Sequence, residues 1–111
     1  MSTETPSLRL ILTMLASEEA ATALVRQLLE ERLIACGTIL PQARSLYRWQ
    51  GTIEESEENV LLLKTEMEVA PRCIKRLAEL HPYEVPEIVL IHPEAVEPAY
   101  AQWVKASVRE N

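Results

Sequence analysis

The segment Leu8–Leu15 is the feature that most restricts how this chain of 111 residues can fold. It is apolar at nearly every position, and it is too short to form a helix of its own. Such a run is typical of a strand that is covered on both faces of a sheet. The sequence therefore predicts a central strand, which needs partner strands and a covering layer.

Further extended stretches supply the partner strands. Pro41 interrupts one of them, and we interpret it as a bend or bulge within a single long strand. The turn signal Gln50-Gly51-Thr52 is followed by the acidic segment Glu54–Glu58, which we expect to be a solvated hairpin end before the next strand begins. The predicted strands after the first are Ile34–Leu40 with Arg44–Gln50, Val60–Thr65 and Ile88–Ile91.

Helical patterns separate these strands. The first helix is predicted from an N-cap at Ser17 to near Leu33, and the third opens at Pro98. The second opens at Pro71, and its inward-facing residues are predicted to be Ile74, Leu77 and Ala78. This order predicts an α+β fold, a ferredoxin-like βαββαβ sandwich with a long hairpin and an additional C-terminal helix. We expect a single domain over residues 7–111, preceded by a frayed tail over residues 1–6.

Composition excludes several classes of function. The net charge of −6 and the lack of a basic stripe argue against nucleic acid as a partner. No apolar run approaches the roughly 20 residues that span a bilayer, so no membrane association is expected. Cys36 and Cys73 lie far apart, which indicates a reduced, cytoplasmic protein, and Cys36 is predicted to be a buried, inert thiol. The chain contains no Asp, and we expect neither an enzyme nor an organic cofactor.

The connection His81–Glu87 concentrates side chains that can carry chemistry. Its two prolines make it stiff. His81 and Glu84 are candidate ligands for a divalent metal ion, copper or zinc, because both metals accept imidazole nitrogen. The alternative is that His81 caps the preceding helix while the carboxylates lie in solvent or in ion pairs.

The predicted hairpin carries a second candidate site. Tyr47 and Trp49 lie on one face of their strand, and Lys64 is expected on the facing strand. With Tyr83 and Glu87, these residues could line a ligand cleft, or the aromatic side chains could pack in an interface between subunits. Lys64 interrupts an apolar strand, which indicates either an ion pair with Glu84 or Glu87 or an anion-binding amine. Five segments of the chain have a distinctive order and spacing: Glu31–Cys36, Ser45–Gly51, Leu63–Thr65, His81–Glu87 and Tyr100–Trp103.

In their order and spacing these segments resemble the CutA divalent-cation tolerance family. The resemblance implies a ferredoxin-like subunit, a homotrimer assembled through the long hairpins, and an architecture shared with PII-type signalling proteins. Some bacterial members have copper ligands at the places of Thr13, Leu80 and His81, of which only His81 could serve here. The resemblance thus favours a trimeric protein of divalent-cation tolerance. The alternative is a PII-like regulatory trimer that binds a small anionic ligand in the cleft between subunits.

Overall fold

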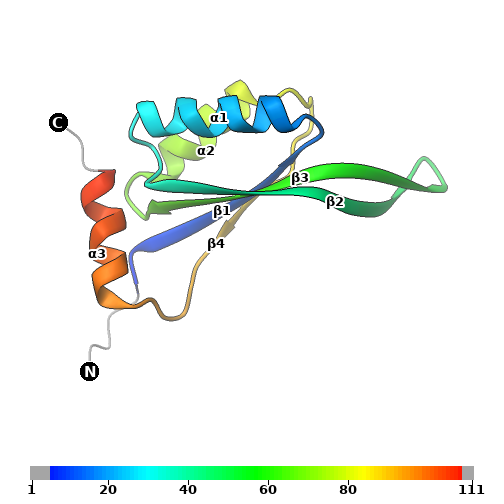
Figure 1. Ribbon diagram of the computed structural model, residues 1–111. Coiled ribbons are helices and arrows are strands. Elements are labelled where there is room, and N and C mark those ends of the chain that lie inside the picture. The colour runs from blue at the N-terminus through cyan, green and yellow to red at the C-terminus, as the bar shows by residue number, and fades with distance from the viewer. Residues whose placement is uncertain (1–5, 109–111) are drawn as a thin grey trace.

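The computed structural model describes residues 6–108 and confirms the predicted ferredoxin-like α+β fold. Most of the predicted N-terminal tail lies outside the described residues. Four antiparallel strands form one sheet in the order β2-β3-β1-β4 (Figure 1). The apolar strand β1 is therefore central, as predicted. Within residues 6–108, no helix is both long enough and apolar enough to cross a membrane. The elements are β1 (Leu8–Leu15), α1 (Glu18–Glu30), β2 (Cys36–Trp49), β3 (Thr52–Glu66), α2 (Ala70–Leu80), β4 (Ile88–Ile91) and α3 (Pro98–Ser107).

The main core lies between the sheet and the two helices α1 and α2, which cover one of its faces (Figure 1). Alternate residues of β1 point into this layer, so Ile11 and Leu15 are completely buried. Leu28 from α1 and Leu77 from α2 are equally buried. Each such side chain contributes about 1.5–3 kcal/mol through burial alone. The packing therefore fixes the positions from which the loops project.

Helix α1 begins as predicted and ends earlier than predicted. The Ala20 backbone N–H donates to Ser17 Oγ over 3.1 Å, which caps the first turn. The helix ends at Glu30 because Arg32 takes a left-handed backbone conformation, with φ of 58°. Leu33 remains buried beyond the helix, and its carbonyl accepts a 2.7 Å hydrogen bond from Thr65 Oγ1. An apolar residue at helical spacing therefore follows the last residue of the helix, which explains why the predicted end was too late.

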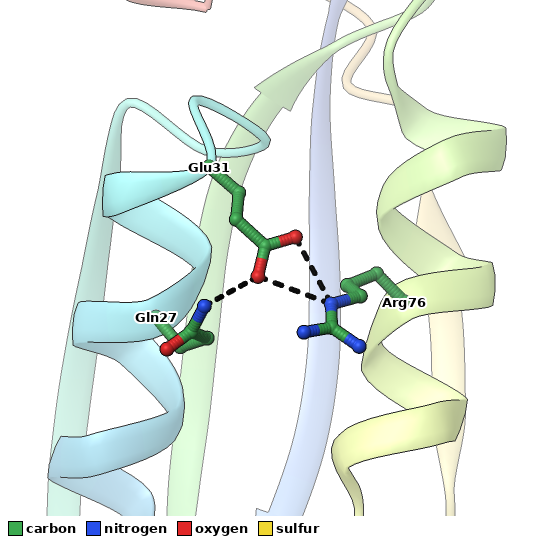
Figure 2. A network of polar contacts seen from close by, with 3 residues as sticks. All are labelled: Gln27, Glu31 and Arg76. Carbon is green, nitrogen blue, oxygen red and sulfur yellow. Dashed lines mark hydrogen bonds and ion pairs between the residues drawn. The ribbon is translucent and has the colours of Figure 1, made fainter.

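A polar link joins the end of α1 to α2 across the surface (Figure 2). The Arg76 side chain lies 2.9 Å from Glu31 Oε1, and Gln27 Nε2 donates to Glu31 Oε2 over 2.5 Å. Hydrogen bonding to Arg76 lowers the pKa of Glu31. Both charged side chains are about one-third exposed, so water screens the pair and it adds little to the stability of the fold.

The inward face of α2 differs by one position from the prediction. Leu77 is buried and Ile74 is half-buried as expected, but Ala78 is exposed. Cys73 takes the inward position instead, and burial raises the pKa of its thiol to about 12. The prediction that Cys36 is the buried thiol was wrong, because Cys36 opens β2 half-buried, with its sulfur 3.8 Å from Tyr100 Oη.

Strands β2 and β3 form the long hairpin that extends beyond the rest of the molecule (Figure 1). Trp49 pairs with Thr52 across the two-residue turn Gln50-Gly51, in which both residues have positive φ, 48° and 83°. That geometry matches the twist of the flanking strands. The pairing register shifts between Leu40 and Ala43, which confirms the predicted irregularity at Pro41. Strand β3 begins directly after the turn, so the acidic segment Glu54–Glu58 is part of the strand rather than a connection before it.

The second face of the sheet is only partly covered. Helix α3 packs against β1 and β3 and buries Val104, and its C-cap residue Val108 joins the main core. Most of the rest of this face is apolar and open, with Leu40 at 48% and Val89 at 43% exposure, although Lys64 and Thr38 also lie on it. The strand register places on it Leu10, Leu12, Met14, Leu40, Val60, Leu62, Val89 and Ile91.

Candidate functional site

A groove of about 800 Å³ runs along the hairpin and meets the connection between α2 and β4; we call it the hairpin groove. It brings together several residues that the sequence analysis selected for a ligand cleft, namely Tyr47, Trp49, Tyr83 and Glu87. The fold therefore places the β2–β3 hairpin next to the connection between α2 and β4, although the two lie far apart in the sequence. The remaining lining residues are Met14, Arg44, Ser45, Leu46, Glu54, Glu58 and Val85.

Aromatic rings form the apolar part of the groove. Trp49 is 59% exposed and Tyr47 is 43% exposed, which is unusual for rings of this size on a single subunit. Tyr83 packs edge-on against His81, with 4.8 Å between the ring centroids. Burial raises the pKa of Tyr83, and the negative charge of Glu58 raises it further. The phenol of Tyr83 therefore stays neutral near physiological pH.

Carboxylates dominate the charge of the groove. Glu54, Glu58 and Glu87 line it, and the strand register places Glu54 directly opposite Tyr47. Among the described residues that line the groove, Arg44 alone is cationic, and its Nε donates to Glu55 Oε1 over 2.6 Å. A groove with this charge balance attracts cations and does not favour the anionic ligand of the alternative prediction.

Lys64, which the sequence analysis also assigned to the ligand cleft, is not among the residues of this chain that line the hairpin groove. It pairs with Cys36 on β2 and with Leu10 on β1, near the end of β3 that is far from the turn. Its ammonium group is hydrogen-bonded to Thr38 Oγ1. The alternation of side chains along each strand had predicted correctly which face of the sheet each residue takes. It carries no information about which residues of two strands lie opposite one another.

His81 is held in place by both of its ring nitrogens. Nε2 lies 2.9 Å from the Met14 carbonyl oxygen and 3.1 Å from Thr13 Oγ1, and Nδ1 accepts from the Tyr83 backbone N–H over 3.2 Å. Because Nδ1 accepts, we assign the proton of the neutral ring to Nε2, which donates to Met14. Burial lowers the pKa of His81. To bind a metal ion, the ring would have to give up one of these contacts.

Glu84, the second predicted metal ligand, is exposed in the same loop and does not line the hairpin groove. His81 is the C-cap residue of α2, and its backbone N–H donates to the Leu77 carbonyl over 2.9 Å, as the capping alternative proposed. In the part of the chain that the structure describes, no three His, Cys, Asp or Glu side chains gather closely enough to hold a metal ion.

The acidic side of the groove was not predicted from the sequence. Glu54 and Glu58 were treated as a solvated hairpin end, although both line the groove together with Met14 and Arg44. A signal for Glu54 was present in the sequence. Counting back from the two-residue turn Gln50-Gly51 places Glu54 opposite Tyr47.

The fold and the groove define a class of protein, namely ferredoxin-like subunits with a projecting hairpin and an acidic, aromatic groove along it. The sequence model of the family described as CutA1 divalent ion tolerance protein matches residues 9–107. The chain belongs to this family.

Relatives with known sequences and structures agree with this assignment. The Divalent-cation tolerance protein CutA of Thermus thermophilus is 41% identical over 95 residues, covering 86% of this chain and 92% of that protein. Protein CutA of Mus musculus is 36% identical over 88 residues, which are 79% of this chain and 50% of the mouse protein. The crystal structure of CutA from Xylella fastidiosa superposes with a TM-score of 0.89 at 38% identity, covering 93% of this chain and 99% of that one.

Proposed function

We propose that this chain is the subunit of a homotrimer that binds divalent cations of the copper or zinc type and so contributes to cation tolerance. The observation that carries the proposal is the acidic lining of the hairpin groove, where Glu54, Glu58 and Glu87 surround exposed aromatic rings. The family is described as one of divalent ion tolerance, and the relative from Thermus thermophilus is a divalent-cation tolerance protein. Carboxylate oxygens bind divalent ions, and zinc accepts them at about 2.0–2.2 Å. The role we propose is binding in the cytoplasm rather than catalysis.

Self-association is supported by the apolar surface that one subunit leaves in water. Leu46, Trp49 and Ile53 on the hairpin are 62%, 59% and 70% exposed. The open face of the sheet adds a further apolar area next to this arm. Monomeric proteins rarely expose contiguous apolar patches of more than a few hundred Å². A second copy offers a matching surface, and the resemblance to the family makes three the expected number of subunits.

The trimer would complete the cation site. Glu58 and Glu87 supply oxygen ligands from one subunit, and the projecting hairpin of a neighbour can bring further carboxylates to the same groove. Glu84 can join from its exposed position in the loop. In this arrangement His81 positions the loop through its contacts with β1, and it becomes a ligand only if Nδ1 leaves the Tyr83 N–H.

Calorimetric titration with Cu²⁺ and with Zn²⁺ tests this proposal. The double variant Glu58→Gln/Glu87→Gln should bind both ions at least about tenfold more weakly, because amides supply neutral oxygens in place of charged ones. Glu79→Gln is the matched control, because Glu79 is exposed on α2 and lies outside the groove lining. Equal affinity in the parent and the double variant would contradict the site.

The oligomeric state is measured separately. Sedimentation equilibrium at micromolar concentration should give the mass of three chains. Trp49→Glu should weaken the assembly, because it places a charge in a contact that must lose its water. A monomeric parent protein would refute the trimer even if the groove binds cations.

A further inference from the structure

Two aromatic rings reach the hairpin groove from separate parts of the fold. Tyr47 belongs to β2 and Tyr83 to the connection between α2 and β4, and they are 43% and 36% exposed. Burial raises the pKa of Tyr83, and the charges of Glu58 and Tyr47 raise it further, so these three groups lie within electrostatic reach of one another. The face of an aromatic ring attracts cations, and aromatic sites for ammonium ligands use this attraction. The groove therefore has the kind of surface that binds an organic cation.

The carboxylates of the groove have no basic partner in the described part of the chain. Glu54, Glu58 and Glu87 form no ion pair with any of residues 6–108. Arg44, the cation in the lining, is already paired with Glu55. The lining therefore keeps a net negative charge that attracts cations from solution.

These carboxylates are spread along the groove. Glu54 and Glu58 point to the same face of β3 and are separated by roughly 14 Å, at about 3.4 Å per residue for a strand. Glu87 comes from the connection between α2 and β4. In the part of the chain that the structure describes, no three side chains of the ligating types gather around one point that a metal ion could occupy. A long molecule with several ammonium groups can contact such carboxylates in turn.

We propose that the hairpin groove binds a linear polyamine, a flexible aliphatic chain that carries several ammonium groups. This rests on the proposed function in one respect, namely that the hairpin groove is a cation site. The ammonium groups pair with the carboxylates of the lining, and the methylene segments between them lie against the rings of Tyr47 and Tyr83. A bare metal ion offers no apolar surface to these rings. The polyamine needs no contact with Trp49, which the proposed contact between subunits would cover.

Calorimetric titration of the full chain in its native assembly, after metal ions have been removed with a chelator, measures this binding. The probes are spermidine and hexaamminecobalt(III), which carry the same charge, although only spermidine has methylene segments. Spermidine should bind at least about tenfold more tightly, because it alone can cover the rings as well as meet the carboxylates. The proposal fails if spermidine does not bind at millimolar concentrations, or if hexaamminecobalt(III) binds as tightly as spermidine.

Matched variants test the rings and the carboxylates separately. Tyr47→Leu should weaken spermidine binding by at least about fivefold and leave hexaamminecobalt(III) unaffected, because it removes the ring and keeps an apolar side chain. Glu54→Gln should weaken the binding of both probes, and it keeps the test valid if sedimentation shows that Tyr47→Leu alters the assembly. Glu57→Gln is the control, because Glu57 is exposed on the same strand and lies outside the groove lining. Parental affinity for spermidine in both Tyr47→Leu and Glu54→Gln would overturn the proposal.

The two proposals for the hairpin groove fail in different ways. If the parent protein binds Cu²⁺ or Zn²⁺ but not spermidine, the polyamine proposal alone is refuted. If it binds spermidine, with the ring dependence described above, but neither metal ion, the polyamine proposal is supported and the metal ions of the proposed function are refuted.

Discussion

Replacing His81 by Ala should cost about 2–4 kcal/mol of folding stability. The ring is 7% exposed, and its removal leaves the Met14 carbonyl and the Tyr83 N–H without their partner. Each lost hydrogen bond contributes about 0.5–1.5 kcal/mol, and the loss of the buried ring adds about 1 kcal/mol. For a chain of this size, the expected fall in Tm is about 8 °C or more.

Urea unfolding at one fixed protein concentration measures the effect, because association between subunits makes stability depend on concentration. His92→Ala is the matched control, since His92 is exposed and its removal should change stability by less than about 0.5 kcal/mol. If His81→Ala is as stable as His92→Ala, the structural role assigned to the ring is wrong. Loss of Cu²⁺ binding without loss of stability would instead identify His81 as a ligand.

The same ring predicts how stability depends on pH. Burial places the pKa of His81 in the folded chain below the value of about 6.5 that applies when the chain is unfolded, and the nearby charge of Glu58 opposes this shift only in part. The unfolded state therefore takes up a proton first as the pH falls. Stability is unaffected by this group above about pH 6.5 and decreases below it, until the folded ring is also protonated. His81→Ala should reduce the dependence of the unfolding free energy on pH below about pH 6.5, and an unchanged slope there would refute the assignment.

Three further predictions follow from particular contacts. Gly37→Ala should destabilise the fold by about 1–3 kcal/mol, because an added Cβ would lie 2.8 Å from Val25 Cγ1; urea unfolding that shows no loss would contradict this. Cys73 should resist iodoacetamide at pH 8 in the native protein, because its thiol is buried and has a pKa of about 12. It should react once urea unfolds the chain, and mass spectrometry of the labelled protein measures both outcomes. Arg76→Ala should leave the midpoint of thermal unfolding close to that of the parent, since water screens the pair with Glu31, and a clear fall in the midpoint would contradict this.

Features with a strong local signal were predictable from the sequence. The central strand β1 was predicted with its observed bounds, because an apolar run of eight residues is short for a helix and too apolar for an exposed loop. The turn at Gln50-Gly51 and the irregularity at Pro41 were predicted for similar reasons, since positive φ and a missing N–H act on the residues themselves.

Features that depend on distant partners were not predictable. The ring of His81 contacts Thr13, which is 68 positions away in the sequence, so nothing near His81 reveals that its nitrogens are engaged. The start of β3 was missed because the projecting arm has no buried face, and its acidic residues therefore show no alternation with apolar ones. Ala78 and Cys73 are both small enough to face inward, and only the packing between the helices and the sheet decides which of them does.

The irregularity at Pro41 also affects how the protein avoids aggregation. Strand β2 is an edge strand of 14 residues, long enough to template the addition of foreign strands. Pro41 has no N–H to offer, and the change of register between Leu40 and Ala43 divides the edge into two shorter pieces. A second edge strand, β4, has only four residues. The long arm can thus present its side chains to a specific partner while its backbone remains a poor template for fibrils.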